Sequence, residues 1–476
     1  MSFTAPEFLL FLAAVLILYR AAPQSWRWAV LLPASYFFYA CHNVWLLSLI
    51  LITTLTSYLC ALRMEKTSSK GKRRAVLAVD LAVCLGILFV FKYLDFALGG
   101  IFSLLSLFGD HGEFHGLNLI LPMGISFYVF QTLSYTIDVY RGTVSAERHL
   151  GYFALFVVFF PQLVAGPIER PADLLPQLRR SPDPKAEDIS QGLRCLVRGY
   201  AKKVLIADWL ARFVDAAYAD AANAGGAALA AATVLFAVQI YCDFSGYSDI
   251  ALGCARLMGV RLTENFRRPY GAATVRDFWR RWHISLTRWF TGYLYIPLGG
   301  SRKGPVRRCV NILAVFLVSG LWHGADVTFL IWGGLHGLYL AAETLLPESR
   351  KERSGPRPLR RAVTLALVCF AWIFFRAENL PHAAQVLQTI ATDFRPGNAL
   401  AGLAMSMPEL LTALMLLALL PMLEALPVLT GEPAEGAALQ SNRAVTLYFL
   451  LITAVVLCRC IALTRGGDTS FLYFQF

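Results

Sequence analysis

Long apolar runs occupy most of this chain, and they limit the folds that it can adopt. A helix needs about 20 apolar residues to cross a bilayer, and here 57% of the 476 residues are hydrophobic whereas 16% are charged. The short alternating segments typical of a membrane β-barrel do not occur in the sequence. We therefore predict an all-α polytopic membrane protein with roughly eleven transmembrane helices, plus re-entrant and interfacial helices, in a single membrane domain over residues 1–476. The clearest spans lie near residues 4–19, 28–42, 44–62, 75–97, 226–241, 309–323, 327–346, 362–377, 408–428 and 444–463.

Basic residues give the chain a formal net charge of +12, and they gather in loops beside the apolar runs, most densely in residues 63–74. Cytoplasmic loops of membrane proteins have this composition, so the charge indicates a membrane surface and not nucleic acid. The first apolar run has no Lys or Arg before it, and Arg20 and Arg27 follow it. This order predicts a retained first span with the N-terminus outside, because a cleavable signal carries its positive charge in front.

Two apolar stretches, residues 121–128 and 160–171, contain both proline and glycine. They predict broken or re-entrant helices, which a membrane tolerates only where protein or a watery cavity satisfies the backbone. They are candidate walls of an internal cavity, and simple kinked helices are the alternative. The polar, proline-rich residues 172–192 are expected to form a surface loop. Residues 192–219 are expected to form a helix whose basic face meets lipid headgroups or serves as a plain flank.

The segment 277–283 combines tryptophan, arginine and histidine. At helical spacing Trp279 and Trp282 share one face, whereas Arg280 falls mostly on another, as in a helix where membrane meets water. Trp279, Arg280, Arg281 and Trp282 are therefore predicted to contact substrate.

A second polar group follows the span near 226–241 and contains Asp243, Ser245 and Asp249. Such side chains are costly within a membrane unless they are paired or wetted. Substrate binding is one interpretation of these three residues, and packing against neighbouring helices is an equally good one.

His323 ends a nearly uncharged run, and an ionisable side chain at membrane depth is a functional candidate. A buried imidazole stays neutral and can act as a general base on a hydroxyl. The alternative is an interhelical hydrogen bond without chemistry. Trp322 is a candidate substrate contact beside it. His283 either assists at the same site or is structural, and His336 fits packing better.

The sequence contains neither a Gly-x-Ser-x-Gly elbow nor an HExxH motif. A histidine base without an evident serine nucleophile favours direct transfer between two substrates. His111 and His115 lie among glycines, and Cys458 and Cys460 are isolated, so we predict no metal site and no bound cofactor.

Several of these stretches together resemble the membrane-bound O-acyltransferase (MBOAT) family, and closely its bacterial alginate and exopolysaccharide O-acetyltransferase branch. The first 100 residues and residues 350–460 match only in hydropathy. The resembling stretches are 121–128, 160–170, 241–250, 278–283, 293–300, 320–324 and 473–476.

This resemblance implies an MBOAT domain with N-terminal spans in 1–100, a catalytic core in 118–346 and C-terminal spans in 359–476, arranged around a thin centre. It implies that His323 is catalytic and that His283 is a second essential histidine. The implied donor is acetyl-CoA or another cytoplasmic acyl thioester, and the implied acceptor is a polysaccharide such as alginate, directly or through periplasmic acetyltransferase partners. The implied location is the bacterial inner membrane.

Two alternatives remain at this point. The first is D-alanyl or other acyl transfer to a cell-wall polymer, because proteins with that activity share the implied fold. The second belongs to another class: a polysaccharide export channel or scaffold whose histidines only pack.

Overall fold

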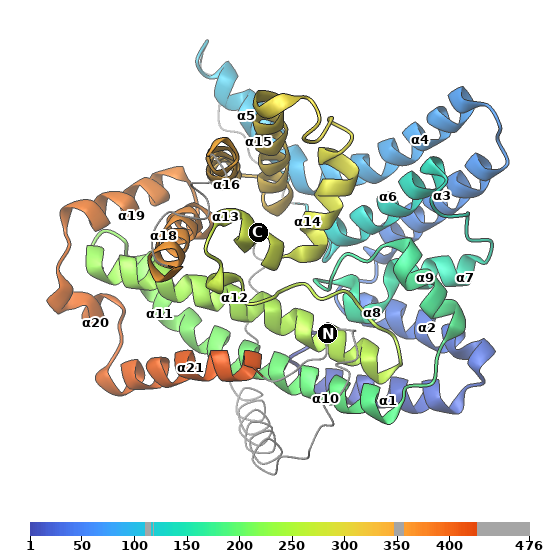
Figure 1. Ribbon diagram of the computed structural model, residues 1–476, viewed down its shortest axis with the longest axis horizontal. Helices are drawn as coiled ribbons and strands as arrows, with labels where there is room; N and C mark the ends of the chain where they lie inside the picture. Colours follow the sequence, from blue (N-terminus) through green and yellow to red (C-terminus); the bar gives the residue numbers. More distant parts are fainter. Residues whose placement is uncertain (110–115, 118, 347–356, 426–476) are drawn as a thin grey trace. The chain divides into compact units, whose positions relative to one another are not determined.

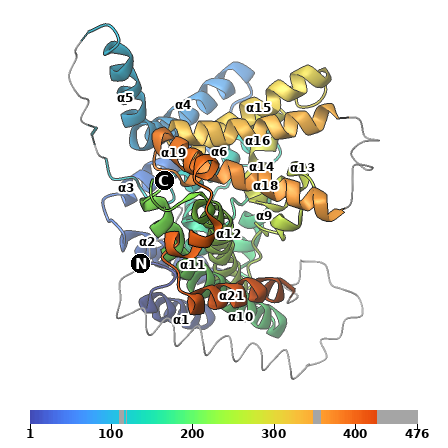
Figure 2. The same cartoon turned by 90° about the vertical axis from the view of Figure 1, so that its left-hand side faces the viewer.

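The computed structural model describes residues 1–109, 116–117, 119–346 and 357–425, and regular structure in these residues is helical throughout (Figures 1 and 2). This confirms the prediction of an all-α protein. Within the described residues six helices are long and apolar enough to cross a membrane: Leu47–Glu65, Lys70–Leu105, Gly226–Leu257, Gly304–His323, Arg357–Arg376 and Met407–Glu424. The count of roughly eleven stays a prediction. The span near 444–463, the chain end at 473–476, and His111 and His115 lie outside the described residues.

The chain divides into two compact units. The first contains residues 1–2, 7–189 and 254–263. Its helices are α1 (Pro6–Ala21), η1 (Gln24–Trp26), α2 (Arg27–Ala40), α3 (Leu47–Glu65), α4 (Lys70–Leu88), η2 (Phe89–Tyr93), α5 (Leu94–Leu105), α6 (Ile125–Arg141), α7 (Leu150–Val158), α8 (Phe160–Leu163) and α9 (Pro171–Arg180).

The two proline- and glycine-containing stretches of the first unit contain irregular backbone and pack on each other: α6 begins only at Ile125, and the predicted break is present in residues 160–171, after α8 ends at Leu163. Gly124 precedes α6 with a φ of 70°, and a Cβ there would meet the carbonyl oxygen of Leu163 at 2.6 Å. Only glycine gives both the left-handed backbone and the close approach. Residues 153–169 are buried throughout, so protein surrounds the irregular backbone between α7 and α9.

Residues 172–192 do not form the predicted surface loop. Most of them belong to α9 and to α10 (Ala186–Tyr200). Pro171 stands in the first turn of α9, where its missing N–H is harmless, and Leu174, Leu175 and Leu178 are buried. The prediction was wrong because proline was taken only as a breaker and the helical spacing of the leucines was overlooked.

The N-terminal amino group lies 3.3 Å from Nε2 of His42, in the turn after α2. The chain start and this turn therefore share one end of the first unit. This arrangement is consistent with a first span that places the N-terminus on one side of the membrane and Arg20 on the other.

The second unit contains residues 3–6 and 190–253 and the described residues from 264 onward. The chain passes from the first unit into the second within α10. It returns to the first unit near the C-terminal end of α12. Its helices are α10, η3 (Ala201–Ala207), α11 (Asp208–Ala219), α12 (Gly226–Leu257), η4 (Pro269–Gly271), α13 (Val275–Arg281), α14 (Ile284–Phe290), η5 (Thr291–Tyr295), α15 (Gly304–His323), α16 (Val327–Leu345), α18 (Arg357–Arg376), α19 (Leu380–Thr392), η6 (Pro396–Asn398), α20 (Ala399–Gly402) and α21 (Met407–Ala425).

α15 and α16 form a close hairpin (Figures 1 and 2). A Cβ on Gly320 would meet the carbonyl oxygen of Phe329 at 2.3 Å, and one on Gly333 would meet that of Phe316 at 2.2 Å. Backbones can approach this closely only where both helices present small residues. The hairpin thereby fixes the end of α15, where His323 is the last helical residue.

Candidate active site

The helix that the spacing within residues 277–283 predicts ends just before His283, where the regular backbone is broken. α13 ends at Arg281 and α14 begins at Ile284, because His283 adopts a left-handed backbone with a φ of 44°. Such a conformation is uncommon for residues other than glycine and persists only where the surroundings impose it. Here the backbone carbonyl of Asn265 accepts the N–H of Ile284 at 3.0 Å.

α13 is anchored at its start. The hydroxyl of Thr274 accepts the N–H of Asp277, and the Glu343 carboxylate of α16 accepts the N–H groups of Val275 at 2.6 Å and Arg276 at 3.0 Å. A carboxylate at a helix N-terminus satisfies donors that have no partner within the helix and suits the helix dipole. This cap holds α13 against the α15–α16 hairpin.

His283 and His323 lie side by side inside the second unit. Their ring centroids are 6.5 Å apart, and the two residues are 0% and 5% exposed. The sequence separates them by two helices, so their proximity is a product of the fold. It brings together the two histidines that were predicted to be catalytic.

Aromatic rings surround both histidines. The ring of His323 lies 4.9 Å from those of Trp322 and Trp332 and 5.5 Å from that of Phe375, and the ring of His283 lies 4.8 Å from that of Phe244. Such an environment excludes water, and for the fully buried ring of His283 it favours the uncharged imidazole. Trp322, a predicted substrate contact, belongs to this cluster.

His336 has a structural partner. Nε1 of Trp279 donates to its Nδ1 at 3.2 Å, and Phe278 stacks on the ring with centroids 6.3 Å apart. This arrangement agrees with the packing role that its glycine-rich surroundings favoured. Trp279 is thereby held between His336 and a cavity.

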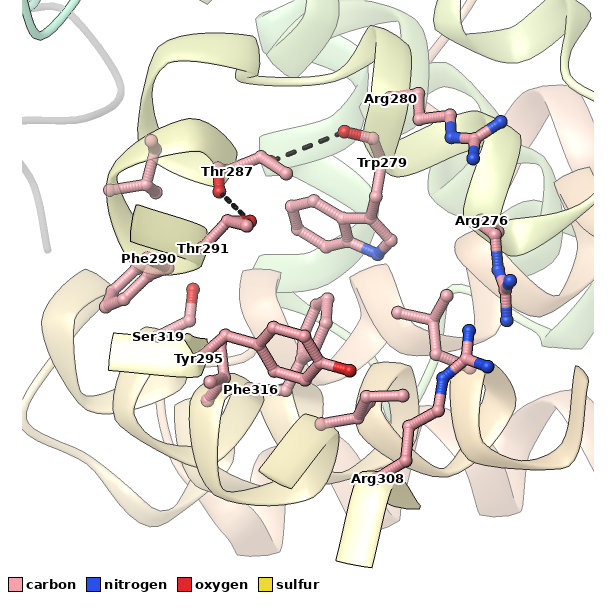
Figure 3. Close-up of a pocket in the computed structure, with 14 residues that line it drawn as sticks. Arg276, Trp279, Arg280, Thr287, Phe290, Thr291, Tyr295, Arg308, Phe316 and Ser319 are labelled. Carbon is pink, nitrogen blue, oxygen red and sulfur yellow. Dashed lines mark hydrogen bonds between the residues drawn. The ribbon is translucent and has the colours of Figure 1, made fainter. Parts of the chain in front are cut away.

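That cavity has a volume of about 370 Å³, within the range of small-molecule sites. It lies between α13, α14 and η5 on one side and α15 on the other. Aromatic and aliphatic side chains form most of its wall, with arginines and hydroxyl groups as the polar members (Figure 3). Its lining consists of Arg276, Trp279, Arg280, Leu286, Thr287, Phe290, Thr291, Tyr295, Arg308, Ile312, Val315, Phe316, Ser319 and Leu340.

Three arginines, Arg276, Arg280 and Arg308, stand together along one side of the cavity (Figure 3). None of them forms an ion pair with a carboxylate in the part of the chain that the structure describes, and Arg276 donates to the Thr344 hydroxyl at 2.8 Å. Uncompensated guanidinium groups beside an apolar wall favour an anionic ligand.

The wall that α15 contributes leads from the arginines toward His323. Arg308, Ile312, Val315 and Ser319 recur every three or four residues along one face, and His323 continues the same helical row. Ser319 Oγ points into the cavity (Figure 3). The lining of this cavity ends at Ser319, one turn before His323.

Two predicted substrate contacts lie elsewhere. Arg281 pairs with Asp277 at 2.9 Å, four residues earlier on α13. Trp282 is buried between Phe278, at 5.4 Å between ring centroids, and Trp372, at 5.2 Å. The structure thus brings Trp279 and Arg280 to the cavity and gives Arg281 and Trp282 structural surroundings.

Asp243 and Asp249 are held in buried ion pairs. Asp243 binds Lys203 at 2.6 Å, and Asp249 binds Lys202 at 3.0 Å and Nε of Arg198 at 2.8 Å. These basic residues were expected to face headgroups, and instead they turn inward to α12. This favours the packing interpretation for both acids. Ser245 Oγ is buried without a hydrogen-bond partner in the described residues, and its predicted contact with substrate stays a prediction.

The charge of the buried Lys203 side chain depends on its carboxylate partners. Burial alone would lower the pKa of Lys203, but the carboxylates of Asp243 and Asp208, the latter at 2.7 Å, raise that pKa above its ordinary value. The ammonium group therefore stays charged and needs its partners.

We expect Asp249→Ala to lower the stability of the protein by about 3–5 kcal/mol, because it leaves two buried cations without their carboxylate. Asp215→Ala is the matched control: its pair with Arg376 is equally direct, but Asp215 is 57% exposed, so the expected loss is about 0–1 kcal/mol. Thermal unfolding in detergent measures both. Normal stability with lost activity in Asp249→Ala would instead favour substrate binding.

Burial lowers the pKa of His283 to about 3. The ring ionises near pH 6.5 in an unfolded chain, so between these values the unfolded state binds a proton that the folded state excludes. His283 therefore makes the protein less stable as the pH falls from about 6.5 towards 3. We expect the thermal midpoint of the wild type to fall more steeply from pH 7 to pH 4 than that of His283→Gln. Parallel curves would contradict this.

No group of three or more His, Cys, Asp or Glu side chains suited to a metal ion occurs within the described ranges.

Comparison with known protein families identifies the class of protein that contains this site. A model of the membrane-bound O-acyltransferase family, MBOAT, matches residues 31–380. The chain belongs to this family, and it is an acyltransferase of a multi-pass membrane type.

Three relatives of this chain have more specific names than the family. The chain is 42% identical to the probable alginate O-acetylase AlgI of Pseudomonas putida over 390 residues, which cover 81% of this chain and 79% of that protein. It is 37% identical to the peptidoglycan O-acetyltransferase of Helicobacter pylori, over 76% and 72% of the two chains. The teichoic acid D-alanyltransferase of Bacillus subtilis is 24% identical over 56% of this chain and 71% of its own.

Sequence reasoning missed several polar residues of the site as candidates, among them two arginines and one asparagine. Arg276 and Arg308 line the cavity with Arg280, and Asn265 contacts His283 at 3.2 Å. The basic turn before α15 was a signal for Arg308. Asn265 gave no signal, because only the fold places it against a residue 18 positions later.

Proposed function

We propose that this protein is a membrane O-acetyltransferase that moves an acetyl group from a cytoplasmic thioester, acetyl-CoA or a similar donor, to a hydroxyl of an extracytoplasmic polysaccharide such as alginate. The observation that carries this proposal is the pairing of two buried histidines beside an arginine-lined cavity in an MBOAT chain. The relatives that are O-acetylases of polymers support acetyl as the group and polysaccharide as the acceptor.

The cavity suits the donor. Arg276, Arg280 and Arg308 would bind the phosphate groups of a CoA-type thioester through charge-assisted hydrogen bonds. Arg308 and Ser319 lie roughly 16 Å apart along α15, at about 1.5 Å per residue, a length that an extended pantetheine arm can cover. The basic loop before α15 supports the cytoplasmic side for the arginine end. The thioester would then lie near Ser319, one turn from His323.

His323 would act as the general base. Its neutral imidazole takes the proton of the acceptor hydroxyl as that oxygen attacks the thioester carbonyl. The tetrahedral intermediate then collapses, the carbon–sulfur bond breaks, and the proton passes from the imidazolium to the departing thiolate. The acetyl group thus passes directly from the donor to the acceptor, without a protein nucleophile. His283 would assist from 6.5 Å away.

The acceptor and the membrane topology complete the proposal. The acceptor hydroxyl belongs either to the polymer or to a periplasmic acetyltransferase partner that passes the group on. We place the protein in the bacterial inner membrane with its N-terminus outside and roughly eleven spans. D-alanyl transfer is the second candidate, favoured only by the more distant teichoic acid relatives.

The test is direct acetyl transfer. Purified protein in proteoliposomes would receive acetyl-CoA with an isotopic label in the acetyl group, together with alginate oligosaccharides, and mass spectrometry would follow the label. We expect labelled ester on the oligosaccharide. Normal polymer acetylation but lost polymer secretion in a deletion strain would instead identify an export channel or scaffold.

A further inference from the structure

One oxygen atom of Asn265 makes three contacts at the break between α13 and α14, where His283 lies. Oδ1 of Asn265 accepts the backbone N–H of Ser285 at 3.2 Å and the hydroxyl of Ser285 at 2.9 Å, and it lies 3.2 Å from Nδ1 of His283. Asn265 is 1% exposed. The last of these three contacts therefore joins a buried amide to a candidate catalytic ring.

The backbone contact fixes the orientation of the Asn265 amide. An amide N–H of the main chain can only donate, so the atom that faces Ser285 must be the oxygen and not the nitrogen. The same oxygen faces Nδ1 of His283. Two acceptors cannot share a hydrogen bond, so Nδ1 must carry the hydrogen.

We propose that Asn265 is a positioning residue that holds His283 as the Nδ1–H tautomer, so that this ring presents Nε2 only as an acceptor. This rests on the proposed function, in which His283 assists His323. His283 then accepts a hydrogen bond from another donor of the acceptor, such as a neighbouring sugar hydroxyl, while His323 takes the proton of the reacting hydroxyl. The second imidazole does not compete for that proton, because burial lowers the pKa of His283 to about 3.

The backbone supports the same assignment. The N–H of Ile284 donates to the carbonyl of Asn265 at 3.0 Å, and the N–H of Arg267 donates to the carbonyl of Arg281 at 2.9 Å. The Asn265–Arg267 strip therefore holds both sides of the left-handed residue His283. The backbone of His283 is thereby fixed, and the contact of its Nδ1 with the amide oxygen selects the protonated ring nitrogen. His323 is an ionisable group close to this ring, with the two ring centroids 6.5 Å apart.

The decisive measurement is the tautomer of His283 in the resting protein. Solid-state NMR of protein labelled with ¹⁵N-histidine distinguishes protonated from unprotonated ring nitrogens, and His283→Gln assigns the signals by subtraction. We expect Nδ1 of His283 to carry the hydrogen and Nε2 to carry none at pH 7. A hydrogen on Nε2 would overturn the proposal. Because no substrate is present, this result is separate from a failure of the acetyltransferase assay.

Variants connect the tautomer to turnover. Asn265→Leu should release the tautomer and lower kcat by about 10- to 100-fold, as loss of a partner that orients a histidine does elsewhere. Ser285→Ala, which removes one donor to the same oxygen and leaves the ring contact, should retain the wild-type tautomer and most of the activity. Equal losses in both variants would assign Asn265 a purely structural role.

Asn265→Asp keeps the acceptor in place and adds a negative charge, so it also serves if the leucine variant does not fold. It should retain the Nδ1–H tautomer and raise the pKa of His283. The pH–rate profile should then gain a loss of activity on the acid side that the wild type lacks. An unchanged profile with an altered tautomer would contradict the proposal.

Discussion

His323→Ala is expected to lower acetyl transfer by about 10²–10⁴-fold, the usual contribution of a general base. The loss should fall on kcat, because the imidazole acts on the hydroxyl during attack and the arginines that would bind the donor stay in place. His323 is 5% exposed and ends α15, so alanine leaves the helix and its hairpin intact. Steady-state transfer of labelled acetyl groups in proteoliposomes measures the effect.

A second histidine provides the control. His382 on α19 bonds the carbonyl of Tyr218 at 3.0 Å, and His382→Ala should transfer acetyl groups close to the wild-type rate. Equal amounts of folded protein, compared by size-exclusion chromatography, separate chemistry from folding. Unchanged turnover in His323→Ala would show that the base lies elsewhere.

Removal of two cavity arginines should have the next largest effect. Each charge-assisted hydrogen bond contributes about 1.5–3 kcal/mol, so Arg276→Gln and Arg308→Gln should each raise KM for acetyl-CoA by about 10- to 100-fold with a smaller change in kcat. The double variant should lose most of the salt dependence of donor binding, because two of the three guanidinium groups are gone.

Arg281→Gln is the matched control for the arginine variants. Arg281 stands beside Arg280 in the sequence but pairs with Asp277 and does not line the cavity. Its KM should stay near that of the wild type. If Arg281→Gln raised KM as much as Arg308→Gln does, a general surface charge and not the cavity would bind the donor.

The sequence predicts those features that depend on composition and short-range spacing. Apolar runs identify the helices, and proline with glycine identifies the breaks near Gly124 and after α7. The isolated position of His323 in an uncharged run identifies it as a candidate, and its place at the end of α15 follows from the same run.

Features that depend on the partner of a side chain are beyond such reasoning. The spacing of Trp279 and Trp282 suggests a helix, yet contacts with Asn265 impose a left-handed residue directly after Trp282. Lys202 and Lys203 have the pattern of a headgroup-facing helix, but Asp249 and Asp243, which turn them inward, lie 40 or more residues away on α12. A pairing at that distance leaves no local signal in the sequence.

The claim on which the account depends is that a donor held by the arginines on one side of the membrane reaches His323 and acetylates an acceptor on the other side. Proteoliposomes of known orientation test it, with labelled acetyl-CoA supplied only to the Arg308 side and oligosaccharide only to the opposite side. We predict labelled ester on the far side in the wild type and almost none in His323→Ala. Transfer only when both substrates share one compartment, or equal transfer by the two proteins, would contradict the account.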